Sequence, residues 1–183
     1  MTSLSARLLL ALLLPGLSAC TTSPWYPLEF APAPVEVALA ANAVPGSQAR
    51  VLVSVLGVAR AHEAQPDLVQ VRVRLENLGT VAVDASEDDL SLLSADLLPF
   101  GKPYVVPAKL HLEPGQSGSL DASFPFPAGR TADTINWNGL NLRLAVEFAG
   151  TRVTTGASFS RVVMVYTTDP NVTVGFGVGY YGH

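Results

Sequence analysis

Alternation of apolar and polar residues with a period of two is the feature that most restricts the fold of this chain. The pattern is clearest over residues 69–76, where four apolar side chains alternate with Gln70, Arg72, Arg74 and Glu76. It recurs over residues 120–126 and 140–148. A period of two places one face of a strand on a core and the other in water, and helical spacing is nowhere sustained. The sequence therefore predicts an all-β protein.

Turn-forming residues separate these runs at intervals suited to short antiparallel strands. They are Asn77-Leu78-Gly79, Pro99-Phe100-Gly101, Pro114-Gly115, Pro127-Ala128-Gly129, Asn138-Gly139 and Gly150. Asn138-Gly139 suits either a tight hairpin or a loop between two sheets. The runs at 51–58 and 162–166 are apolar on both faces, which is typical either of strands covered on two sides or of an edge strand packed under a loop. We expect an immunoglobulin-like antiparallel β-sandwich of about seven strands over residues 49–168.

A short apolar run near the N-terminus indicates a targeting segment. Arg7 precedes the seven apolar residues 8–14, which are too few to span a bilayer, and Leu17-Ser18-Ala19-Cys20 follows. This order resembles the lipobox of bacterial lipoproteins. The resemblance implies that residues 1–20 are a lipoprotein signal peptide, cleaved before Cys20, and that Cys20 carries the lipid. The alternative is an ordinary secretory signal with an unmodified Cys20.

The residue after the cysteine bears on location. In lipoproteins of this kind an aspartate there tends to retain the protein at the inner membrane, and this chain has Thr21 instead. The resemblance therefore implies a bacterial outer membrane location, with the periplasmic face expected rather than the cell surface. Two or more acyl chains make such an anchor stable.

Residues 21–48 are rich in proline, which fixes φ and removes backbone donors. We expect an extended, semi-rigid linker, fourteen residues of which would span roughly 40 Å, with an edge strand at 35–39 as an alternative. Trp25 and Tyr26 lie close to the expected anchor. Their rings suit the headgroup region of a membrane, and the alternative is that they pack on the domain or lie free in the linker.

Composition excludes some classes of partner. The chain has 11 basic and 15 acidic residues and a net charge of −4, with no basic patch, so no nucleic-acid partner is expected. Cys20 is the only cysteine. Once it is lipidated, neither a disulfide nor a thiolate metal site is available, and burial alone must hold the sandwich together.

A second resemblance covers residues 50–130. A strand at 71–77 ends in Asn77, a second strand runs into an acidic turn at 92–96, and Pro114-Gly115 opens a strand that ends at Phe126. This order resembles the secreted immunoglobulin-like lipoprotein domains of unknown function found in bacteria. It is also similar to the water-stress type of sandwich, although Leu78-Gly79 follows Asn77 where that family prefers Asn-Pro. Neither family carries an agreed catalytic residue.

Catalytic chemistry has little support in the residues. No Gly-x-Ser-x-Gly motif is present, and the histidines are His62, His111 and His183. His111 alternates with Leu110 and Leu112, which places it on the solvent side of a strand. We therefore predict that the protein is not an enzyme and that it has no cofactor.

The densest charged group consists of Asp84, Glu87, Asp88 and Asp89. Carboxylates suit calcium, and His62 offers a further ligand in a loop with Asp67. Calcium loops usually interleave their acids with glycine, whereas here three adjacent acids precede a strand. We favour a solvated turn, with a metal site at these residues as the alternative.

The C-terminal segment 169–183 combines glycine with apolar residues. One side of an extended chain would carry Val172, Val174, Phe176, Val178 and Tyr180. This segment is either a mobile tail or loose edge strand, or it pairs with an open sheet edge of a partner or another copy.

Together these features predict a non-catalytic, membrane-anchored envelope lipoprotein. We expect it to act as a protein-interaction or structural accessory module with another envelope protein as its partner. The alternative is a periplasmic lipoprotein that binds a small ligand or a metal.

Overall fold

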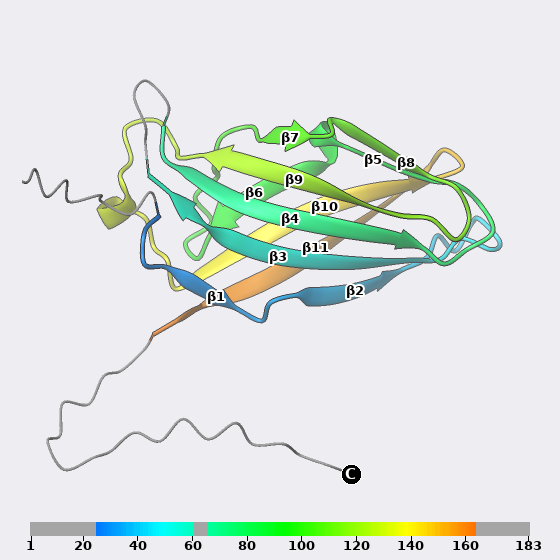
Figure 1. The fold of residues 1–183 in the computed structure, drawn as a ribbon, viewed down its shortest axis with the longest axis horizontal. Coiled ribbons are helices and arrows are strands. Elements are labelled where there is room, and N and C mark those ends of the chain that lie inside the picture. Colours follow the sequence, from blue (N-terminus) through cyan, green and yellow to red (C-terminus); the bar gives the residue numbers. More distant parts are fainter. Residues whose placement is uncertain (1–24, 61–65, 164–183) are drawn as a thin grey trace, which may run out of the picture.

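The computed structural model describes residues 25–60 and 66–163, which form two antiparallel sheets packed face to face (Figure 1). Cys20, His62 and the segment with Val172, Val174, Phe176, Val178 and Tyr180 lie outside the described residues. Within the described ranges, no helix has the length and apolar character needed to cross a membrane.

The five-stranded sheet, sheet A, follows the order β2-β3-β4-β9-β7. Its long central strands are β3 (Ala49–Ala59), β4 (Leu68–Asn77) and β9 (Ser117–Pro125). Its edges are β2 (Val35–Leu39) and β7 (Tyr104–Val106). A β-bulge interrupts the pairing of β3 with β4 between Val55 and Gly57.

The six-stranded sheet, sheet B, follows the order β1-β11-β10-β5-β8, with β6 also paired to β10. Its strands are β1 (Glu29–Ala31), β11 (Thr151–Val162), β10 (Gly139–Phe148), β5 (Val83–Ser86), β8 (Lys109–Leu112) and β6 (Leu90–Ser94). Strands β5 and β6 pair with opposite ends of β10. The short 3₁₀ turn η1 (Glu87–Asp89) lies between them.

The core consists of the inward-facing alternate residues of both sheets. In β4 and β10 the apolar members of the alternation are buried, and the largest fully buried side chains include Phe124, Phe148, Leu75 and Leu142. The all-β antiparallel sandwich is therefore confirmed. The strand count is wrong: the described residues contain eleven strands, not about seven. The additional strands are mostly short.

The proline-rich segment is part of the sandwich and not a linker. β1 pairs with β11 and β2 pairs with β3, so residues 29–39 pass from sheet B to sheet A. Upstream of β1, the Tyr26 amide donates to the Val58 carbonyl at 2.8 Å. The linker predicted over 21–48 is therefore wrong from Trp25 onward, and the edge strand at 35–39 is confirmed. Proline is tolerated at the ends of short edge strands, where no ladder donor is needed.

The two ends of the sandwich differ. At the terminal end, Trp25 and Val163 are the first and last described residues, and β1 pairs there with the end of β11. An aromatic cluster fills this end, with ring centroids 5.5–6.2 Å apart, and consists of Phe30, Phe100, Phe126 and Trp137. At the opposite loop end, the chain turns at 40–48, 78–82, 113–116 and 149–150 (Figure 1).

The connection that contains Asn138-Gly139 is a loop between the sheets. β9 belongs to sheet A and β10 to sheet B, and the loop between them includes the 3₁₀ turn η2 (Ala132–Thr134). Of the two alternatives for this turn, the crossing between sheets is therefore the one observed.

Phe30 tests whether the proline-rich segment belongs to the fold. Its ring is buried against Trp137, with centroids 6.2 Å apart, and deleting a buried phenyl ring destabilises a domain by about 3–5 kcal/mol. We expect Phe30→Ala to lower the free energy of unfolding by about 3 kcal/mol in urea denaturation. Glu29→Ala, on the exposed face of the same strand, should change it by less than about 0.5 kcal/mol. If both variants changed the free energy of unfolding by the same small amount, residues 29–39 would not be part of the cooperative fold.

Candidate functional site

The predicted acidic cluster does not converge on one point. The Lys102 ammonium lies 2.9 Å from an Asp88 oxygen and 3.4 Å from a Glu87 oxygen, and these hydrogen bonds raise the pKa of Lys102. The Asp89 carboxylate instead faces Arg152 of β11 at 2.7 Å. It also accepts hydrogen bonds from the backbone amide and hydroxyl of Ser86. Each carboxylate of η1 therefore has a cation of the protein as its partner.

This arrangement gives the acidic turn a structural role. Lys102 precedes β7 of sheet A, whereas η1 connects β5 and β6 of sheet B, so the ion pairs of Lys102 join segments of the two sheets. Among the described residues, no group of three or more His, Cys, Asp or Glu side chains is placed to hold a metal ion.

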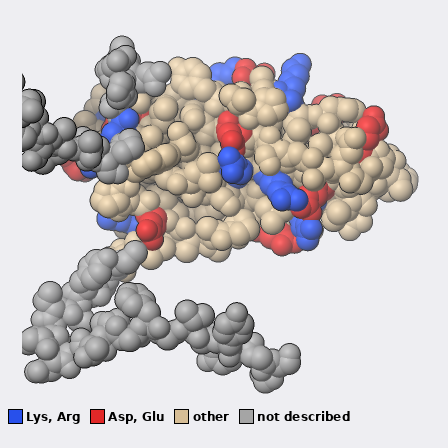
Figure 2. All heavy atoms as spheres, viewed as in Figure 1, with Lys and Arg blue, Asp and Glu red and all other residues tan. Residues whose placement is uncertain are grey.

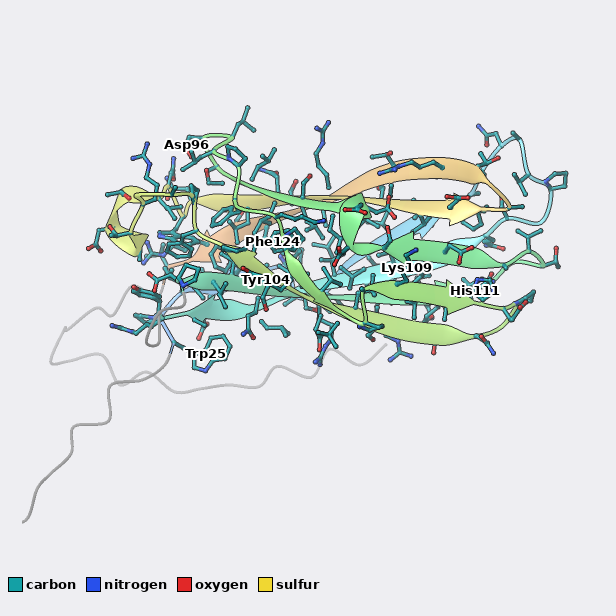
Figure 3. All side chains as sticks on the ribbon, turned by 90° about the horizontal axis from the view of Figure 1, so that it is seen from above. Trp25, Asp96, Tyr104, Lys109, His111 and Phe124 are labelled. Atoms are coloured by element: carbon teal, nitrogen blue, oxygen red, sulfur yellow. The ribbon has the colours of Figure 1, made fainter. Side chains whose placement is uncertain are left out.

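Asp84, the fourth acid of the predicted cluster, pairs across the ladder with His111 of β8. The Asp84 Oδ1 atom lies 2.7 Å from His111 Nδ1, and Glu113 Oε1 lies 3.3 Å from Nε2. The hydrogen bond with Asp84, and then the one with Glu113, raises the pKa of His111 above its ordinary value. His111 is exposed, as its alternation with Leu110 and Leu112 predicts. Figure 3 shows it near the loop end.

The loop end is built around one buried amide. Asn77 is fully buried, and its side-chain nitrogen donates to the carbonyls of Val81 and Leu112 at 2.8 and 3.0 Å. Its side-chain oxygen accepts from the Gly79 amide at 3.0 Å. Asn77 thus holds its own turn and connects that turn to the end of β8. A fully satisfied buried polar group fixes one loop conformation.

The turn after Asn77 also joins the loop at 40–48. The Leu78 amide donates to the Gln48 carbonyl at 2.9 Å, and the Thr80 amide donates to the Gly46 carbonyl at 2.8 Å. A Cβ atom at Gly79 would lie 2.2 Å from the Gly46 oxygen, so only glycine fits this close approach. The two loops therefore form one connected surface.

Leu78 stands out on this surface because it is a large apolar residue that is 52% exposed. It borders a shallow hollow of about 360 Å³ lined mainly by small residues, which are Ala38, Leu39, Ala40, Gly46, Ser47, Gln48, Gly79 and Thr80. Loops positioned by a rigid scaffold are where binding residues concentrate, and Leu78 is the large exposed apolar side chain that this loop surface offers beside the hollow. We take this loop-end surface, Leu78 with its hollow, as the candidate functional site.

The residue types of Asn77-Leu78-Gly79 predict the turn, and the strand pattern predicts that a strand ends at Asn77. Neither feature predicts the loop-end surface. The partners that bury Asn77 include Leu112, which is 35 positions away. A composition signal alone does not show such a contact.

Replacing Asn77 tests the rigidity of the loop end. Asn77→Ala leaves two buried carbonyls without their donor, and such a loss costs about 1–3 kcal/mol. We expect the free energy of unfolding to fall by about that amount, with faster hydrogen exchange at the amides of Gly79 and Thr80. The matched change Asn138→Ala, at an exposed asparagine, should leave both measurements near those of the parent protein.

The His111 contacts predict a specific pH dependence. Because the folded-state pKa of His111 is raised, its ion pairs stabilise the fold fully below the ordinary histidine pKa of about 6.5. This contribution disappears as the pH rises through the folded-state pKa. Asp84→Asn should lower the His111 pKa measured by NMR titration. The stability difference between this variant and the parent should shrink above that pKa. Asp133→Asn should leave the His111 titration unchanged, and an equal effect of both variants would contradict the assignment.

No protein-family model and no curated protein matches the chain. Among solved structures, it is similar to the yjhA protein from Bacillus subtilis, with 13% identity over 59% of this chain and 76% of that chain and a TM-score of 0.37. It is also similar to the GAE domain of GGA2p from Saccharomyces cerevisiae, with 10% identity, coverage of 72% and 100%, and a TM-score of 0.31. A structural-genomics target, SoR45, gives 9% identity, coverage of 84% and 96%, and a TM-score of 0.35. These likenesses are too distant to carry an argument about function.

Proposed function

We propose that this protein is a lipid-anchored, non-catalytic module of the bacterial cell envelope. In this proposal Cys20 carries the lipid, the anchor lies in the outer membrane with the domain on the periplasmic face, and the loop-end surface binds another envelope protein. The sequence Leu17-Ser18-Ala19-Cys20 supports the anchor. The observation that supports the binding role is that the two ends of the sandwich differ.

This difference supports the proposal because Trp25, the first described residue after Cys20, and the candidate site lie at opposite ends. Trp25 follows Cys20 by only five positions and lies at the terminal end, whereas Leu78 lies at the loop end. β3 runs between the ends with 11 residues, which span roughly 36 Å at about 3.3 Å per residue. An anchored domain with this geometry holds its rigid apolar loop at a distance from its tether, where a partner can reach it.

The anchor is tested by growing cells with an alkyne analogue of palmitate. The parent protein should incorporate the label and sediment with outer membranes, whereas Cys20→Ala should lose the label and become extractable without detergent. Retention of the label by Cys20→Ala, or a parent protein without label, would contradict the proposal.

The contact is tested by site-specific photo-crosslinking in intact cells, with a photoreactive phenylalanine analogue in place of Leu78 or of Leu97. Both leucines are exposed, and Leu97 provides the matched control near the terminal end. We expect a discrete crosslinked protein from position 78 and none from position 97. We further expect Leu78→Asp, but not Leu97→Asp, to abolish its co-purification with the protein. The same products from both positions would rule out the loop-end surface.

A further inference from the structure

The outer face of sheet A is divided into a charged half and an uncharged half. The charged half holds ion pairs, with Arg72 of β4 paired to Asp121 of β9 at 2.7 Å and Arg74 paired to Glu76 along β4 at 3.1 Å. Hydrogen bonds from Arg72 hold the pKa of the Asp121 carboxyl below its usual range. In Figure 2, which views this face, charged side chains gather over the middle and toward the loop end. The surface between the middle and the terminal end is mostly tan.

The uncharged half is a continuous row of side chains across four strands. Tyr104 of β7 pairs with Ser123 of β9, which pairs with Gln70 of β4, which pairs with Gly57 of β3. The Trp25 ring covers Gly57, because a Cβ atom there would lie 2.9 Å from the ring carbon Cε3. Figure 3 shows Trp25 on this outer side of the sheet. From β3 to β7 the row crosses three strand spacings, about 14 Å.

Large apolar side chains are exposed along this row. Trp25 and Leu56, at the β3 bulge, are 39% and 44% exposed, and Tyr104, at the β7 edge, is 67% exposed. Val106, 73% exposed, lies beside Tyr104 on the next row, opposite Asp121 at the border of the charged half. We call these four residues, together with Gln70 and Ser123 between them, the neutral face. The nearest charges at the terminal end are engaged: the Arg60 guanidinium lies 4.5 Å from the Tyr26 ring centroid, and the Tyr26 hydroxyl donates to Asp67 at 2.8 Å.

Trp25, the first residue that the structure describes, lies at this same face. Only four residues separate Cys20 from Trp25, and five Cα-to-Cα steps reach at most about 17 Å. The Cα atom of Trp25 therefore lies within about 17 Å of the Cα atom of Cys20. A longer stalk would leave the domain far from its anchor, whereas so short a connection keeps Trp25, at one end of the neutral face, close to the surface that holds Cys20.

We infer that the neutral face lies on the bilayer that holds the anchor, with Trp25 and Tyr104 at the level of the lipid headgroups. The inference rests on the proposed lipidation of Cys20. Tryptophan and tyrosine favour the membrane–water interface because one part of the ring system is apolar and the other forms hydrogen bonds. No charged side chain of the row has to be desolvated. The Arg72–Asp121 pair marks the border where the domain tilts away, so the loop end stays in water.

The experiment uses the lipidated full chain in vesicles of phosphatidylethanolamine and phosphatidylglycerol. Because lipidation consumes the Cys20 thiol, a single added cysteine takes the environment-sensitive fluorophore NBD. Val106→Cys reports on the neutral face, and Ser158→Cys, exposed on the outer side of sheet B, is the matched control. We expect a blue-shifted NBD emission and quenching by doxyl lipids at position 106 only.

A second variant separates face contact from simple proximity to the anchor. Tyr104→Glu in the Val106→Cys background should abolish the quenching while flotation with the vesicles persists. Thr154→Glu, on the outer side of sheet B, should leave the quenching unchanged. Both side chains are exposed, and an unchanged urea midpoint verifies that each variant is folded.

The outcomes distinguish this inference from the proposed function. Protein that does not float with vesicles would overturn the lipid anchor itself. Protein that floats but gives equal signals at positions 106 and 158, or none at 106, would overturn the membrane-facing orientation alone. Shielding of position 106 in cell envelopes but not in vesicles would assign the neutral face to a protein partner instead and would likewise overturn it.

Discussion

Burial of the alternate, inward-facing side chains of β3, β4, β9 and β10 is the interaction on which the rest of the structure depends. The chain has one cysteine, so no disulfide within the chain joins the two sheets, and the fully buried Phe124, Phe148 and Leu142 have to do so. Because one face of sheet A packs in this core, its other face is exposed to solvent and carries the ion pairs and the neutral face. The short strands β1 and β2 then close one side of the sandwich by passing from sheet B to sheet A.

The two ends of the sandwich are closed by different interactions. The terminal end is closed by aromatic rings around Trp137 and receives the chain at Trp25. The loop end is closed by hydrogen bonds around Asn77, which leave Leu78 exposed. A lipid at Cys20 would hold the terminal end close to a membrane, because the connection to Trp25 is short. The loop end would then point away from the membrane.

The long strands were predictable from the sequence because alternation is a local property: β4, β9 and β10 each carry it over most of their length. The strands that were missed have no such pattern. β1 has only three residues and one buried side chain, Phe30, and β7 is a three-residue strand bounded by prolines. Proline content suggested a linker, whereas pairing with β11 and β3 makes the segment part of the fold.

The loop-end site was harder to predict, since Asn77 and Leu112 meet only through tertiary structure. The acids of η1 form a visible cluster in the sequence, but their partners come from elsewhere in the chain: Lys102 from the loop before β7 and Arg152 from β11.

If Cys20 carries a lipid, as proposed, a domain that includes Trp25 lies directly against the anchoring membrane. Neutron reflectometry of the lipidated protein on a supported bilayer measures this arrangement most directly, because it gives the protein density as a function of height above the headgroups. The account predicts that the protein layer starts at the headgroups, with no hydrated gap wider than about 17 Å. A solvent layer of roughly 40 Å between bilayer and protein, the reach of an extended fourteen-residue linker, would contradict it.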